Sequence, residues 1–307
     1  MKTVLEAFAL TAIAVVTLAG AARAEPFRPE HVAEDANWLV HVDGDAMRQS
    51  SVMQRFWQRE LSGWEDVETQ IAAIVDQMCM DPAQDLAGVL AYGPTLGSPD
   101  GVLIVYAAVD RARFVEKVRQ APEYRTGNHR QFVWHAWVQA DGPVTCGFFR
   151  PDVLVFAKSD ARVMAALDVL DGRSPAIAAQ HPLAAPTVSP GTMFLFRAAG
   201  LNEAMLPLQS PVTKHCTSLH IAYGEHKQTS FGQLSLEVPS AEIAEQVRAV
   251  LEGVRATALL QFGAEPAWDR LLKGIKITQS ENRVDARSTV PADEVWAVIQ
   301  TVLDWAP

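Results

Sequence analysis

The spacing of apolar residues along the chain changes repeatedly between that of a strand and that of a helix. In the first half, continuous or alternating apolar stretches predict strands at 38–43, 101–109, 132–139 and 152–157. Helical spacing predicts helices that follow Asp45 and Ser159, which we expect to cap them, and a helix at 110–120. One more amphipathic helix is predicted at 64–78, where apolar residues share one face.

The second half repeats this alternation of strand and helix patterns. Strands are predicted at 193–196, 220–224, 231–238, 274–278 and 284–290. Helices are predicted at 202–206, from Ser240 to Val254, and from Pro291 onward. Two helical patterns of the first half recur in register in the second. These patterns are Val109/Phe114/Val118 with Val238/Ile243/Val247, and Val163/Leu167/Leu170 with Val295/Ile299/Val302. They indicate an internal duplication, although the common alternation of strands and helices also produces similar sequence patterns in unrelated segments.

A break in the pattern separates the two halves. Residues 172–191 contain four prolines and no period, which is typical of a linker. The sequence therefore divides into a first half at 25–171 and a second at 192–307. Because neighbouring strands along the chain favour hairpins, the predicted class is α+β, with each half a mostly antiparallel sheet and helices packed on one face.

The first 24 residues have the pattern of an export signal. A positive start, the apolar run 4–19 and the small-x-small sequence Ala22-Arg23-Ala24 predict cleavage after Ala24. We therefore expect a periplasmic or secreted protein. No later stretch is apolar for long enough to predict a transmembrane segment after signal cleavage.

Composition narrows the possible partners. The 307 residues carry 26 Lys+Arg against 36 Asp+Glu, a net charge of −10, which argues against nucleic acid and anionic membrane surfaces as partners. The three cysteines, Cys79, Cys146 and Cys216, are widely spaced. They fit buried small hydrophobic residues best, while one disulfide with a leftover thiol stays open.

The chain lacks the familiar local motifs of catalysis. It has no Gly-x-Ser-x-Gly, Cys-x-x-Cys, Gly-rich phosphate loop or His-Glu-x-x-His, so no residue is assigned as catalytic, cofactor-binding or metal-binding. The best polar cluster is His41, Asp43 and Asp45. His41 and Asp43 share a strand face and could bind a metal or form a base with its orienting group. The simpler interpretation makes Asp45 a helix cap, Asp43-Gly44 a turn and His41 a hydrogen-bonded core residue.

Four other stretches each allow a functional and a structural interpretation. Cys216 and His220 share a face if 214–226 is a strand, with His215 on the other, which is too few ligands for a closed zinc site. Residues 132–137 suggest an aromatic platform or an interior strand. Residues 92–101 suggest a lid or an ordinary hairpin connection. Met78-Cys79-Met80 suggests a soft-metal site or the end of a core helix.

The stretch from Trp38 to Val52, WLVHVDGDAMRQSSV, resembles a loose group of uncharacterised exported bacterial proteins with tandem α+β modules. In that group a hydrophobic strand is followed by an Asp and a helix with an Ala-hydrophobic-x-x-Ser pattern. The resemblance implies export and two related α+β halves. It implies no known cofactor and supplies no catalytic residue.

The reading that the sequence favours is a non-enzymatic envelope protein that binds a partner protein or a small ligand between its two halves. One alternative is an amphipathic carrier of lipid or lipoprotein, which would show a contiguous apolar cavity between sheet and helices. Another is a metal-dependent hydrolase that uses His41 and Asp43, which would bring His41 near further His, Asp or Glu side chains.

Overall fold

The computed structural model describes residues 26–60, 76, 78–184, 188–201, 212 and 215–305. The predicted export signal, the predicted helix at 202–206 and all but two residues of the one at 64–78 lie outside the described residues. The chain forms two compact units. Unit 1 consists of residues 1–48 and 56–188, and unit 2 of residues 49–55 and 189–307.

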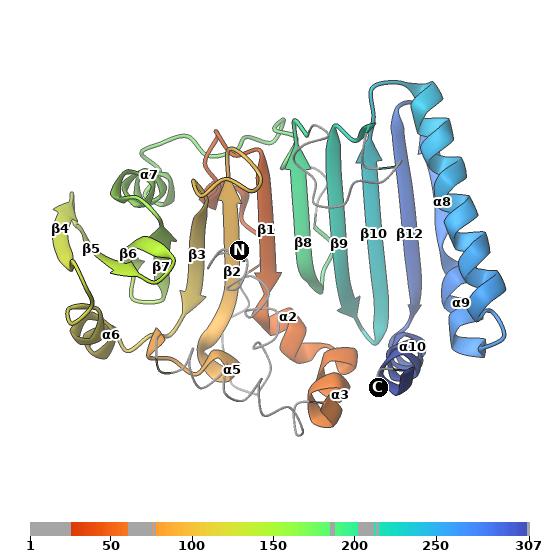
Figure 1. Ribbon diagram of the computed structural model, residues 1–307, viewed down its shortest axis with the longest axis horizontal. Coiled ribbons are helices and arrows are strands. Elements are labelled where there is room, and N and C mark those ends of the chain that lie inside the picture. The colour runs from red at the N-terminus through yellow and green to blue at the C-terminus, as the bar shows by residue number, and fades with distance from the viewer. Residues whose placement is uncertain are drawn as a thin grey trace. The chain divides into compact units, whose positions relative to one another are not determined.

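Unit 1 is built on an antiparallel sheet (Figure 1). Seven of its described segments are strands, and each pairs with the next in the order β1(Trp38–Asp43), β2(Leu86–Gly93), β3(Val102–Ala107), β7(Val153–Ala157), β6(Gly142–Arg150), β5(Phe132–Gln139) and β4(Arg125–His129). The helices of this part of the chain are η1(Pro29–His31), α2(Gly44–Gln49), α3(Ser51–Glu60), α5(Pro82–Asp85), α6(Arg111–Val118) and α7(Asp160–Leu170), and the first turn of α3 belongs to unit 2.

Helices α6 and α7 cover opposite faces of the unit 1 sheet. Phe114 of α6 packs edge-on against Phe148, with ring centroids 5.9 Å apart. The neighbouring residue Gly147 faces the other way, where a β-carbon would lie 2.9 Å from both Val163 and Leu167 of α7. Since successive strand residues point to opposite faces, the helices of unit 1 are not confined to the single face expected from the sequence.

Unit 2 is also an antiparallel sheet with helices. Its strands pair in the order β8(Thr192–Ala199), β9(Ser218–His226), β10(Thr229–Glu237), β12(Arg283–Pro291) and β11(Lys276–Ser280). In the described part of the unit, the helices α8(Ala241–Phe262) and α9(Pro266–Gly274) lie between β10 and β11 in the chain, and α10(Ala292–Trp305) follows β12. Helix α8 contacts α9 and the strands β11 and β12.

The two units share one strand order. The order β1-β2-β3-β7-β6 in unit 1 corresponds to β8-β9-β10-β12-β11 in unit 2, and the hairpin β4–β5 extends the sheet only in unit 1. In both units a helix follows the third strand of this order and another ends the series. The predicted α+β class with antiparallel sheets is confirmed. The shared order supports the predicted duplication, which stays a prediction.

The bounds of two strands and the starts of two helices that were predicted from strong sequence patterns are confirmed. Strands β1 and β5 have the predicted bounds, and the side chains of Ser159 and Ser240 accept hydrogen bonds from backbone amides three residues on, as caps do. Strands β2, β4 and β6 and helix α9 were not predicted from the sequence pattern. Three of these begin beside or contain turn-forming residues: LAGVLAYG, RTGNH and GPVTCGFFR.

The predicted cap at Asp45 is wrong. Helix α2 already begins at Gly44, so Asp45 lies inside its first turn, and the predicted turn at Asp43-Gly44 is also wrong. The cap is Asp43, whose Oδ1 accepts a 2.9 Å hydrogen bond from the amide of Ala46. Asp45 instead forms a buried ion pair with Arg48, which also donates to the Leu86 carbonyl.

Candidate functional site

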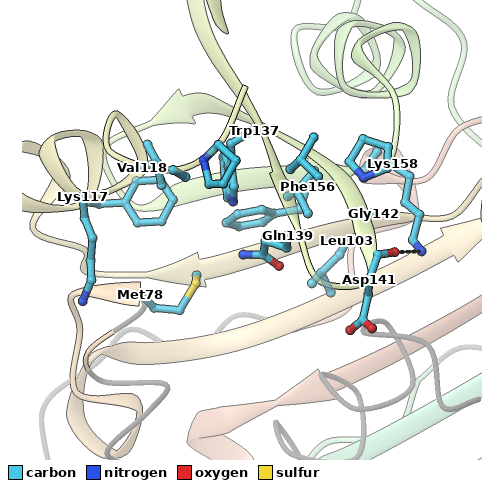
Figure 2. A pocket seen from close by; sticks show the side chains of 17 residues that line it. Met78, Leu103, Lys117, Val118, Trp137, Gln139, Asp141, Gly142, Phe156 and Lys158 are labelled. Carbon is cyan, nitrogen blue, oxygen red and sulfur yellow. Dashed lines mark hydrogen bonds between the residues drawn. The ribbon is translucent and has the colours of Figure 1, made fainter. Parts of the chain in front are cut away.

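An apolar cavity of about 300 Å³ lies in unit 1, between α6 and the sheet face that α6 covers (Figure 2). Its position follows from the strand register. Trp137 of β5 pairs with Val144 of β6, and Leu103 of β3 pairs with Phe156 of β7. All four side chains project to one face because β6 and β7 also pair in register. Together with α6 they form the walls.

The walls are aromatic and aliphatic. Phe114 of α6 is 1% exposed and contacts Trp137 and Phe156 edge-on, with ring centroids 6.2 and 6.4 Å apart. Val118 lies one helical turn further along α6, and Met78 lines the cavity from another segment (Figure 2). The volume falls at the lower end of the range of roughly 300–1,000 Å³ that is typical of small-molecule sites.

Polar groups occur at the two ends of this cavity, where Figure 2 shows Lys117 and Lys158. Lys117 forms an ion pair with Asp76, with Nζ 2.5 Å from Oδ1, and donates to the Asp76 carbonyl at 2.7 Å. The hydrogen bond from Lys117 lowers the pKa of Asp76. Lys158 donates to the carbonyl oxygen of Asp141 at 3.3 Å. The cavity thus combines an apolar interior with a few charged groups at its edges.

His41 and Asp43, predicted as a metal-binding pair or a base with its orienting group, both lie in β1 and have protein neighbours. His41 is 2% exposed in β1, and its ring lies edge-on to Phe27 with centroids 5.8 Å apart. Burial raises the pKa of Asp43, whose carboxylate is engaged as the cap of α2. Across the described ranges, no three His, Cys, Asp or Glu side chains gather in a way that could hold a metal ion.

The His- and Cys-containing stretch of unit 2 has protein partners. His220 lies in β9, and its Nδ1 accepts a 3.1 Å hydrogen bond from Nε of the buried Arg197 in the paired strand β8. Burial and the nearby guanidinium lower the pKa of His220 to about 4. Cys216 is buried before the strand begins and donates to the Ser218 carbonyl, and His215 is exposed.

The remaining candidate stretches have ordinary structural roles, with one addition. Residues 132–137 form part of the interior strand β5, and Trp137 lines the cavity. Of the stretch 92–101, Tyr92 and Gly93 belong to the end of β2, and the residues that follow connect β2 to β3 as a hairpin. Met78, Cys79 and Met80 are all buried, and Met78 reaches the cavity wall. Burial of all three cysteines confirms their reading as small core residues, and burial raises the pKa of the Cys216 thiol to about 11.

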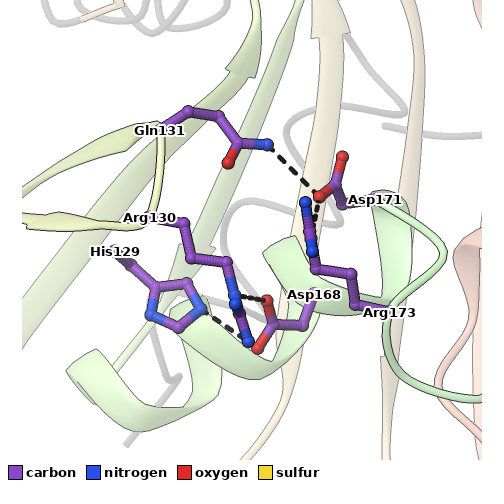
Figure 3. Close-up of polar contacts among 6 residues, drawn as sticks. All are labelled: His129, Arg130, Gln131, Asp168, Asp171 and Arg173. Carbon is purple, nitrogen blue, oxygen red and sulfur yellow. Dashed lines mark hydrogen bonds and ion pairs between the residues drawn. The ribbon is translucent and has the colours of Figure 1, made fainter.

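A second polar cluster joins the tip of the β4–β5 hairpin to the end of α7 (Figure 3). His129 Nε2 lies 3.0 Å from Asp168 Oδ2, and Arg130 Nε donates to Asp168 Oδ1 at 2.9 Å. Gln131 donates to Asp171 at 3.2 Å, and Arg173 forms an ion pair with the same carboxylate. Because three of these four contacts hold the hairpin against the helix and the fourth lies within the helix end, we assign this cluster a structural role.

The residues that line the cavity could not be identified from the sequence. Apolar periodicity shows which residues face the core but not where the core is incompletely filled. Lys158 was the one available signal, because it is a charged residue placed between a fully apolar strand and a helix cap.

Among the helices that the structure describes, none is both long and apolar enough to cross a membrane.

Comparisons with known proteins extend the description of the fold. No family profile matches the chain, and no curated protein sequence matches it. A solved structure of the treponemal protein TP0453, in crystal form III, aligns with a TM-score of 0.51 at 10% identity and covers 90% of this chain and 99% of that one. Crystal form I of TP0453 aligns with a TM-score of 0.46 at 11% identity, over 91% and 98% of the two chains. The likeness to crystal form III shows that this α+β fold also occurs in TP0453.

Proposed function

We propose that this protein is an exported binding protein whose unit 1 takes up a small apolar ligand in the cavity beneath α6. The single observation that carries the proposal is the contiguous apolar cavity between sheet and helix, which is the feature expected of an amphipathic carrier. Export to the periplasm or the outside of the cell, by the predicted signal at residues 1–24, is part of the proposal. The favoured sequence reading, a partner or ligand bound between the two halves, stays a prediction.

The physical argument rests on what the cavity can stabilise. Burial of apolar surface is worth about 25 cal/mol per Å², and an apolar cavity of this size holds water poorly. Phe114, Trp137 and Phe156 supply large apolar contact areas from rigid rings. A ligand of matching shape would therefore gain burial without displacing well-bound water.

The hydrolase alternative is supported less well. It would require Asp43 to act as a ligand or base, but Asp43 already accepts the hydrogen bond from Ala46 that begins α2. The groups around His41 that the structure describes include the Phe27 ring, which is apolar.

The test is a titration of the full exported chain with the uncharged fluorescent probe N-phenyl-1-naphthylamine. We expect saturable binding of one probe per chain. Val118→Phe places a ring in the cavity and is expected to weaken binding by at least about tenfold. Val115→Phe is the matched control, because Val115 lies on the same helix but does not line the cavity. Circular dichroism checks that both variants fold.

Two results would count against the proposal. One is the absence of saturable binding to the wild-type chain. The other is an equal effect of Val118→Phe and Val115→Phe. Native and denaturing mass spectrometry of the exported protein adds an independent readout, because a ligand retained from the cell would raise the native mass above the denatured one.

A further inference from the structure

We infer that the ligand of the cavity is a single-chain amphiphile with an anionic head group, a carboxylate of medium chain length, whose head group lies at Lys158. This inference rests on the proposed function and specifies its ligand. It follows from the unequal neutralisation of the two lysines that line the cavity.

At one end of the cavity the positive charge is already neutralised. Lys117 forms its ion pair with Asp76 at 2.5 Å and also donates to the Asp76 backbone carbonyl at 2.7 Å. Two contacts to one residue fix the ammonium group in place. An anionic ligand would therefore have to compete with the Asp76 carboxylate at this end.

At the other end the positive charge has no carboxylate partner in the described part of the chain. The contact of Lys158 is the hydrogen bond to the Asp141 carbonyl, and at 3.3 Å this bond is long. Figure 2 shows the Asp141 carbonyl directed at Lys158 and its carboxylate directed away. Lys158 is half-buried as a residue and lines the cavity, so a carboxylate at the cavity edge can form an ion pair with its ammonium group.

The backbone of the β5–β6 turn maintains this arrangement. Gly142 has a φ of +111°, which side-chain-bearing residues rarely adopt, and it pairs with Gln139 across the turn. The turn thereby holds the Asp141 carbonyl toward Lys158. The strand β7 ends at Ala157, so the following lysine extends from the sheet to the cavity edge.

The cavity volume sets the length of the ligand's alkyl chain. A volume of about 300 Å³ equals that of roughly ten water molecules, and a methylene group occupies slightly less space than a water. A chain of about ten carbons would fill the space between the two lysines. Longer chains would extend into solvent.

The experiment measures, by calorimetry at pH 7.5, how the full protein chain binds three probes that each carry a ten-carbon chain: decanoate, 1-decanol and decyltrimethylammonium. We expect decanoate to bind most tightly and the cation most weakly. Lys158→Gln is expected to weaken decanoate binding by about three- to tenfold and to leave decanol binding unchanged. The matched control is Lys276→Gln, which removes an exposed lysine of β11 that does not line the cavity and should leave both affinities unchanged.

The outcomes separate this inference from the function on which it rests. If decanol binds as tightly as decanoate and Lys158→Gln changes neither, the head-group assignment is overturned and the apolar cavity stands. Equal losses in Lys158→Gln and in the control variant would also overturn it, because the effect would then be one of general charge. If none of the three probes binds, the proposed function itself fails.

Discussion

The carboxylate of Glu225 in β9 accepts a 2.7 Å hydrogen bond from the hydroxyl of Ser50, which lies 175 positions earlier in the chain. The same carboxylate accepts three more hydrogen bonds: from the Ser51 hydroxyl at 2.7 Å, the Ser51 amide at 3.0 Å and the Val52 amide at 3.2 Å. It thus satisfies free amides at the start of α3. This anchor explains why the short segment 49–55 belongs to unit 2.

Glu225→Gln is predicted to destabilise unit 2 by about 1–3 kcal/mol. The amide of Gln offers one acceptor oxygen in place of two and no charge, so buried donors lose their partners. Urea unfolding followed by tryptophan fluorescence measures the change. The matched control is Glu237→Gln, since Glu237 is exposed at the end of β10. An equal stability for both variants would contradict the anchoring role.

The effect of Glu225→Gln is predicted to depend on pH. Burial raises the pKa of Glu225, but the four hydrogen bonds together outweigh burial and hold the pKa below its ordinary value of 4.5. A lowered folded-state pKa contributes stability above the unfolded value, and this contribution is lost as the pH falls through the folded value. The gap between wild type and variant should therefore be full near pH 6 and shrink below pH 4.5. A constant gap would argue against it.

Asp43→Ala is predicted to cost about 1 kcal/mol, while Asp43→Asn should cost little. The Asn side chain keeps an oxygen that can accept from the Ala46 amide, and it also removes a charge whose burial raises the pKa of Asp43. Thermal unfolding of the two variants distinguishes the cap from an electrostatic role. If both substitutions destabilised the chain equally, the carboxylate charge rather than the cap would be the cause.

The extent of sequence-based prediction followed the strength of local signals. The strand at Trp38–Asp43 was predicted to the residue because its apolar run ends at a single Asp. Asp45 was mistaken for the cap because Asp43 and Asp45 both have the right chemistry, and only the backbone decides which one precedes the first helical residue. The edge strand β4, with the sequence RTGNH, carries no apolar alternation and could not be recognised.

The candidate site was beyond sequence reasoning for a different reason. Trp137 and Phe156 were correctly assigned to strands, but their meeting on one face of the sheet depends on the pairing order β3-β7-β6-β5. The contact of Ser50 with Glu225 likewise joins residues far apart in the chain. The Ser of the Ala-hydrophobic-x-x-Ser pattern was visible from the start, but its partner was not.

Asp168→Asn is predicted to loosen the β4–β5 hairpin. Partial burial raises the pKa of Asp168, but hydrogen bonds from His129 and Arg130 outweigh burial and lower it, so the carboxylate is charged and paired. Because Arg130 is 48% exposed, we expect a cost of only about 0.5–1 kcal/mol. Hydrogen exchange should become faster in the hairpin and stay unchanged in β2. Asp152→Asn, at an exposed ion pair with Arg150, is the control.

The length of the ligand chain is predicted to control affinity up to a limit set by the cavity. Each buried methylene is worth about 0.8 kcal/mol, or about a fourfold gain in affinity. In the series hexanoate, octanoate, decanoate and dodecanoate, affinity should therefore rise steeply and then level off near ten carbons, when about 300 Å³ is filled. Val118→Phe should move the plateau to a shorter chain, because the new ring occupies part of the same space. A rise that continues unchanged beyond dodecanoate in both proteins would instead indicate adsorption to an open surface.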